Sequence, residues 1–193
     1  MKRKILILSV LVICAAILAA GSLAYFTADT RAHNVITTGG VDIVLDEWAN
    51  AGRTEPFEDR TDVMPGAKIT KIAEVRNTGS GSVWVRVQLT VELYSESKEQ
   101  MDPKYVSLDI NDTDWKYSEG YYYYNRVLAP GETTAPIFTT VSFDANMGNE
   151  YQNATANVDV DAYAVQSDNN GEDVFSANGW PLPTPIPEPT VAP

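Results

Sequence analysis

Apolar and polar residues alternate along most of this chain from residue 41 onward. The clearest run has six aliphatic side chains on one face, namely Val83, Val85, Val87, Leu89, Val91 and Leu93. A period of two predicts a β-strand that is buried on one face. Burying six such side chains contributes on the order of 10 kcal/mol before entropy is subtracted. A slip of one residue would bring Arg86 and Glu92 into the core, so we expect a firm register.

The same alternation predicts about eight strands. A second strong strand is expected at 156–164, where small apolar residues alternate with Asn157, Asp159, Asp161 and Tyr163. Weaker strands are expected at 41–48, 69–77, 105–110, 114–118, 121–128 and 136–143. No long helical pattern interrupts them. The pattern predicts an all-β fold, an antiparallel sandwich of the jelly-roll type.

Turn residues separate several of these strands. Pro65-Gly66 and Pro130-Gly131 each place the fixed angle of proline before a glycine, as a type II turn requires. Residues 77–82, rich in glycine and serine, predict a hairpin loop between the strands on either side. Turns at these intervals support an antiparallel arrangement.

The first 28 residues have the features of an export signal. Lys2, Arg3 and Lys4 precede an uncharged run that extends to residue 26. The small residues Ser22 and Ala24 fit signal peptidase, which we expect to cut after Ala24 and to leave Tyr25 as the first residue. Two alternatives are cleavage after Ala28 and retention of the run as a membrane anchor, for which it is long enough. Cleavage predicts a secreted protein that meets the membrane only through its signal.

The expected organisation has five parts. These are a signal peptide at 1–24, a mature N-terminal segment at 25–40, a sandwich domain at 41–167, a loop or one helical turn at 168–180, and a proline-rich tail at 181–193. Alternating prolines favour extended polyproline II in the tail and exclude a sheet strand there.

Charge and cysteine content exclude several functions. Cleavage would remove three basic residues and leave 11 against 26 acidic ones, a formal charge of −15. Such a surface repels nucleic acid. The only cysteine, Cys14, lies in the signal, so the mature protein has neither a disulfide nor a cysteine-ligated metal.

The residues give little support for catalysis or for a cofactor. His33 is the only histidine, whereas a catalytic zinc needs about three protein ligands. Calcium is the least implausible metal, because oxygen-bearing residues crowd two loops. One loop holds Asp109, Asn111, Asp112 and Asp114, and the other holds Asp168, Asn170 and Glu172. Neither has EF-hand spacing, and Asp and Asn are also common turn residues. We therefore expect no enzyme and no resident metal.

The run Tyr121 to Tyr124 offers a possible sugar-stacking surface together with Trp48, Trp84 and Trp115. Consecutive residues of a strand point to opposite faces, so only two of these tyrosines share a surface. We expect the rings mainly to cover a sheet face or to cap the core.

An ordered set of short segments resembles the TasA/camelysin family. The segments are 23–27 (LAYFT), 34–39 (NVITTG), 41–43 (VDI), 63–71 (VMPGAKITK), 75–80 (VRNTGS), 128–132 (LAPGE) and 162–166 (AYAVQ). The first of these is similar to the SipW-type signal of that family. The resemblance implies a jelly-roll domain that a Gram-positive-type bacterium secretes for fibres, biofilm matrix or cell-surface coats. It also implies that residues 25–39 donate a strand to a neighbouring subunit, whereas the alternative is that they fold back on their own sheet.

We therefore expect a non-enzymatic structural component that associates with itself or with other matrix subunits. The alternatives are a carbohydrate-binding or adhesive surface module and a divergent camelysin-like metallopeptidase. The peptidase is disfavoured by the single histidine.

Overall fold

The computed structural model describes residues 40–58, 65–95, 97–148, 151 and 154–181. They belong to the unit His33–Pro193. Within this part of the chain the strands are β1 (Ile43–Trp48), β2 (Lys68–Asn77), β3 (Val83–Tyr94), β4 (Gln100–Met101), β5 (Val106–Leu108), β6 (Trp115–Ser118), β7 (Tyr121–Tyr124), β8 (Phe138–Phe143) and β9 (Thr155–Gln166), and a short 3₁₀ helix spans Pro103–Tyr105. No helix among the described residues is long and apolar enough to cross a membrane.

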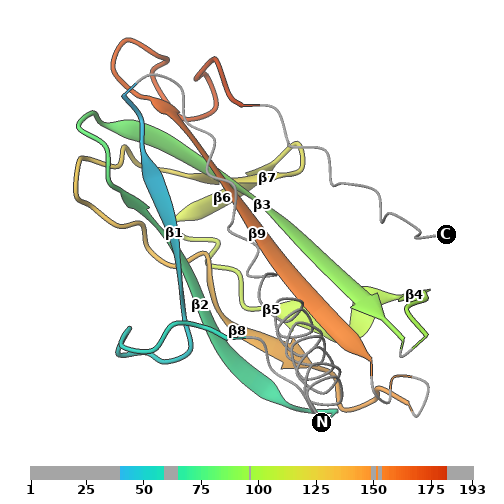
Figure 1. Ribbon diagram of the computed structural model, residues 1–193. Coiled ribbons are helices and arrows are strands. Elements are labelled where there is room, and N and C mark those ends of the chain that lie inside the picture. Colours follow the sequence, from blue (N-terminus) through green and yellow to red (C-terminus); the bar gives the residue numbers. More distant parts are fainter. Residues whose placement is uncertain (1–39, 59–64, 96, 149–150, 152–153, 182–193) are drawn as a thin grey trace, which may run out of the picture. The chain divides into compact units, whose positions relative to one another are not determined.

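The strands form two antiparallel sheets that share one core (Figure 1). The first sheet has the order β1-β2-β8-β5. In the second sheet β3 pairs with β9 along one side and with β7 and β4 along the other, and β6 pairs with β7. The predicted all-β sandwich is confirmed. Each expected strand range contains a strand, and the two-residue β4 was missed because it is too short to show an alternation.

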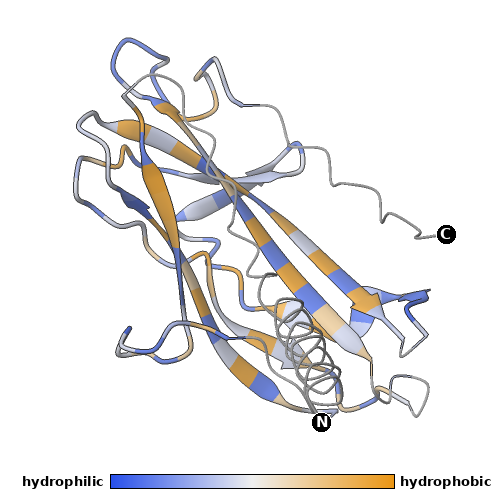
Figure 2. Ribbon diagram, in the orientation of Figure 1, coloured by the Kyte–Doolittle hydropathy of each residue, from blue (hydrophilic) through white to orange (hydrophobic). Residues whose placement is uncertain are grey.

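The longest pairing joins β3 to β9 over twelve residues, from Val83 opposite Gln166 to Tyr94 opposite Thr155. Figure 2 shows the alternation of hydrophobic and hydrophilic residues along both strands. Val83, Val85 and Val87 are completely buried and pack with apolar residues of the first sheet. The core therefore lies where the alternation places it.

Positive φ angles occur at both expected turns. Gly66 has φ +79° and Gly131 has φ +80°. At the second turn the Glu132 N–H donates to the Ala129 carbonyl at 3.0 Å. This is the bond between the first and last residues of a β-turn whose third residue has positive φ.

One face of β3 differs from the expectation. Trp84 and Arg86, expected on the polar face, are only 7% and 9% exposed, and Tyr163 opposite Arg86 is 4% exposed. The physical reason is that residues 174–181 cover this face. Val174 and Ala177 join Trp84 there in a second apolar cluster.

The packed structure also continues beyond residue 167. Residues 168–180 consist of turns and bends without a helix, which agrees with the loop alternative. Pro181, placed by the sequence at the start of the tail, is buried. The remainder of the predicted tail, 182–193, lies outside the described residues.

Candidate functional site

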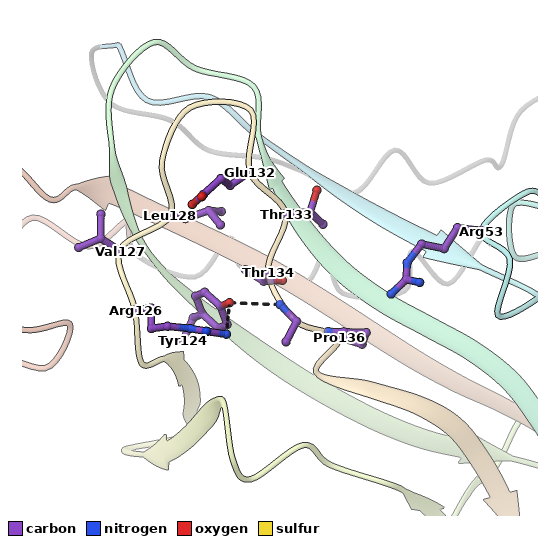
Figure 3. Close-up of a pocket in the computed structure, with 10 residues that line it drawn as sticks. Arg53, Tyr124, Arg126, Val127, Leu128, Glu132, Thr133, Thr134 and Pro136 are labelled. Carbon is purple, nitrogen blue, oxygen red and sulfur yellow. Dashed lines mark hydrogen bonds between the residues drawn. The ribbon is translucent and has the colours of Figure 1, made fainter.

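An open pocket of about 590 Å³ lies beside the loop that joins β7 to β8 (Figure 3). Its lining includes Arg53, Tyr124, Arg126, Glu132 and Thr134. In Figure 3 the Tyr124 hydroxyl lies between the Arg126 side chain and the backbone of the loop, and it accepts a hydrogen bond from Arg126 at 2.9 Å. The pocket therefore has a polar wall.

The polar groups of this wall are already engaged in structural bonds. Arg53 Nε donates to both carboxylate oxygens of Glu74 at 2.8 and 2.9 Å, and Arg126 pairs with Asp114 at 2.8 Å. Glu132 accepts from the Ala129 N–H at 3.0 Å. Both guanidinium groups therefore have a carboxylate partner, and the lining contains no histidine or cysteine. We therefore assign no chemistry to the pocket.

The first candidate calcium loop is closed by hydrogen bonds within the protein. Both oxygens of Asp109 accept from β8, and its Oδ1 receives the N–H groups of Thr139 and Thr140 at 2.8 and 2.6 Å. Burial by itself raises the pKa of Asp109, but these hydrogen bonds outweigh it and hold the pKa below its ordinary value. Asn111 Oδ1 accepts from the N–H groups of Thr113 and Asp114, as in an Asx turn.

Other groups of the two loops also form hydrogen bonds within the protein. Asp114 accepts from Asn111 and Arg126, and the backbone carbonyl of Asp112 accepts from Lys116. In the second loop the Asn170 amide donates to the Gln166 and Asn178 carbonyls. Among the described residues no group of three or more acidic, histidine or cysteine side chains is placed to hold a metal, and this includes Asp168 and Glu172. The loops act as structural turns.

The tyrosine run is divided between the two faces of β7, as the strand geometry predicts. Tyr122 and Tyr124 pack on the main core, whereas Tyr121 and Tyr123 belong to the second cluster. Tyr123 and Tyr124 are buried. Tyr122 is half-buried and its ring lies 5.0 Å from that of Tyr117, which is 66% exposed. Within the hairpin formed by β6 and β7, Tyr117 has the most exposed aromatic ring, and Tyr122 extends its surface.

The Tyr117–Tyr122 pair borders an open apolar groove of about 350 Å³. Its walls come from the inner faces of both sheets, with Leu89 and Val91 on β3 and Leu108 on β5. All three side chains are half-buried. Here the sandwich leaves part of its core accessible to solvent.

A different feature lies along β9, whose outer edge pairs with no described strand. Val83 exchanges both backbone hydrogen bonds with Leu128, so its bonding groups point away from Gln166 on β9. Because an antiparallel pair alternates, every second residue of β9 directs its N–H and C=O away from β3. These residues are Ala156, Val158, Val160, Ala162, Ala164 and Gln166.

This outer edge of β9 is nevertheless shielded. Val160 and Ala164 are 0% exposed and Ala162 is 4% exposed. Buried backbone groups are almost always hydrogen-bonded in folded proteins. Nearer the start of β9, the Val158 carbonyl accepts a hydrogen bond from Lys71 Nζ at 2.9 Å, across the gap between the two sheets. Lys71 therefore binds one of the carbonyl groups of β9 that point away from β3.

Lys71 and its partner Glu47 were missed by the sequence reasoning. Lys71 Nζ lies 3.0 Å from Glu47 Oε1 and 4.7 Å from the centre of the Phe57 ring, and Lys71 is only 7% exposed. A change of register between Thr70 and Ala73 brings Lys71 to this position. No sequence signal marks such a bulge, although the charged residues Glu47 and Lys71 within the two expected strands are visible in the sequence.

Five residues that the sequence singles out lie outside the described residues, namely the processing residues Ser22, Ala24, Tyr25 and Ala28 and the histidine His33. Comparisons with protein-family models, with curated proteins and with solved structures found no match.

Proposed function

We propose that this protein is a secreted structural component of a bacterial cell surface or biofilm matrix, with no enzymatic activity, and that its subunits join by strand addition. In this proposal residues 25–39 of one subunit pair with the outer edge of β9 in the next. The observation that carries it is the edge itself, since Val160, Ala162 and Ala164 are buried although no described strand pairs with them on the side away from β3. Strand addition at an open edge would supply backbone partners where no described strand pairs with β9.

The start of the described chain lies close to this edge. The Asp42 carbonyl accepts from the N–H groups of Thr78 and Gly79 at 2.9 Å, in the loop that leads to Ser82. The Ser82 carbonyl in turn accepts from Ser167, directly after β9. Asp42 is therefore bound to a loop whose last residue contacts the chain at the C-terminal end of β9.

The length of the N-terminal segment fits this edge. Twelve residues of β9 span about 40 Å, and the fifteen residues 25–39 reach about 50 Å when extended. The segment is long enough to cover its own β9 or, after exchange, that of a neighbour. Exchange between subunits in a head-to-tail manner does not close and propagates as a filament. The all-β sandwich and the acidic sequence suit such an extracellular subunit.

Two proteins test the proposal, one that begins at Tyr25 and one that begins at Gly40. We expect the first to elongate, with light scattering that increases with concentration, and the second to remain monomeric. The variant Ala156→Pro in the longer protein removes one N–H that points away from β3 at a half-buried position of β9, where an edge strand tolerates proline. It should slow elongation and keep the circular dichroism of the sandwich. Equal scattering by the two proteins would refute strand addition.

A second function is favoured by one observation. The exposed Tyr117 with Tyr122 beside it forms an aromatic surface next to an apolar groove, which suits stacking on a sugar ring. A carbohydrate-binding or adhesive role predicts that Tyr117→Ala abolishes retention on glycan arrays. Unchanged retention, or none by the wild type, would refute it.

A further inference from the structure

We propose that Arg86 and the aromatic rings around it form a clamp that fixes Trp180 and Pro181 to β3, and that this clamp prevents a pull on the proline-rich tail from peeling β9 off the sheet. The inference does not depend on strand addition. We call residues 167–181 the strap, because they lead from the end of β9 back over the second sheet.

The clamp is centred on the guanidinium of Arg86. Its Cζ lies 3.8 Å from the centre of the Tyr121 ring, 4.7 Å from that of Trp180 and 5.5 Å from that of Tyr163. A cation within about 6 Å of a ring face is attracted by the ring quadrupole. Trp180 of the strap therefore supplies one wall of an aromatic enclosure whose other walls come from the sheet.

Hydrogen bonds connect the same guanidinium to the strap. Arg86 Nη2 donates to the Pro181 carbonyl at 3.1 Å, and Nη1 donates to the Tyr123 hydroxyl at 3.4 Å. Its Nε is buried without a hydrogen-bond partner, and no ion pair with Arg86 is found among the described residues. A buried charge is costly without compensation. Because Trp180 and Pro181 provide two of the compensating contacts, Arg86 and the strap stabilise each other.

The strap is also held at points before the clamp. Trp84 Nε1 donates to the Asn170 carbonyl at 3.1 Å, and Val174 and Ala177 are buried against β3 and β7. The Asn178 N–H donates to Asn170 Oδ1 at 2.8 Å, which closes the strap into a loop. These contacts position Trp180 over Arg86.

The mechanical consequence follows from the position of β9. Within the described part of the chain β9 pairs only with β3, whereas β3 has partners on both sides (Figure 1). A load on the C-terminus would reach β9 at Gln166 and open its hydrogen bonds one after another. With the clamp in place the load first reaches Arg86 on the interior strand. The tail that follows is suited to a spacer, since five of its last twelve residues are proline.

Force spectroscopy on the chain that begins at Tyr25 tests the clamp. One handle is attached at residue 193 and the other at Ser80→Cys, an exposed position in the loop before β3. Ser80 precedes Val83, which lies opposite Gln166 at the C-terminal end of β9, so a pull transmitted through Gln166 would unzip β9. We expect two steps in the wild type. The first releases the fifteen residues of the strap, about 50 Å, and the second releases β9.

The decisive variant is Trp180→Ala, and its matched control is Phe175→Ala. Phe175 is also an aromatic residue of the strap with its ring 5.1 Å from that of Tyr123, but it is 52% exposed and does not contact Arg86. Trp180→Ala should at least halve the force of the first step, and Phe175→Ala should leave it within the scatter of the wild type. An unchanged first step in Trp180→Ala, or release of strap and β9 in one step in the wild type, would overturn the proposal.

Hydrogen exchange gives an independent reading without load. The amide of Asn178 should exchange at least tenfold faster in Trp180→Ala and in Arg86→Met than in the wild type, while amides of β9 that face β3 change less than twofold. Less than a twofold change at Asn178 in both variants would show that the strap is held without the clamp, and would equally overturn the proposal.

Discussion

Replacing Lys71 by methionine should destabilise the domain strongly, because the change removes one partner of a buried ion pair. Lys71 Nζ contacts Glu47 at 3.0 Å and the Val158 carbonyl at 2.9 Å. The side chains of Lys71 and Glu47 are only 8% and 14% exposed. Breaking a buried pair by removing one partner costs about 3–5 kcal/mol. The remaining exposure of Glu47 places the expected loss at the lower end, about 3 kcal/mol.

Urea unfolding followed by tryptophan fluorescence measures this loss. For a domain of this size the dependence on urea is about 2 kcal/mol per molar. A loss of about 3 kcal/mol therefore lowers the midpoint by about 1.5 M. The matched control is Lys68→Met on the same strand, where the side chain is exposed, and its midpoint should change by less than about 0.3 M.

The double variant Glu47→Leu with Lys71→Met separates the ion pair from packing. Replacing both partners by apolar residues of similar size is often neutral or stabilising. The double variant should therefore recover most of the midpoint lost in Lys71→Met. The assignment of a buried pair would be refuted if Lys71→Met lowered the urea midpoint no more than Lys68→Met does. It would also be refuted if the double variant had the same midpoint as Lys71→Met.

Three further predictions concern stability. Thr134→Val leaves the buried Val75 N–H without its 3.0 Å acceptor and should cost about 1–3 kcal/mol in urea unfolding. Gly131→Ala, at φ +80°, should cost about 1 kcal/mol, whereas Gly81→Ala, with open space around it and no positive φ, should cost clearly less in the same assay. The lowered pKa of Asp109 means that its carboxylate stabilises the fold above the unfolded-state pKa and that this contribution is lost as the pH falls through the folded-state pKa. The difference in melting temperature between wild type and Asp109→Asn should therefore narrow below about pH 4.

The strand pattern was predictable because the core lies on one face of each strand. The alternation at 83–93 and 156–164 places the aliphatic side chains in the core in the pairing that the structure shows. The Pro-Gly pairs likewise fall at turns with positive φ. In such cases local chemistry and tertiary structure favour the same conformation.

The second buried layer was not predictable from periodicity. Trp84 and Arg86 are buried by a strap that lies almost a hundred residues later in the sequence and has no regular pattern of its own. An outward-facing arginine beside a tryptophan is equally suited to solvent. Lys71 was hidden for a related reason, since a shift of register changes which residues of β2 face inward.

The edge of β9 and the clamp on β3 have linked mechanical consequences. In a free subunit β9 has β3 as its only described strand partner, so the clamp is the main protection of β9 against a load from the tail. If a neighbour adds a strand to the outer edge, β9 becomes an interior strand with hydrogen bonds on both sides. Peeling then requires two rows of bonds to open, so the β9 step in force spectroscopy should occur at a higher force after assembly. Trp180→Ala should accordingly lower the force that detaches β9 more in monomers than in assembled material. An equal reduction in both would show that the clamp acts independently of the proposed assembly.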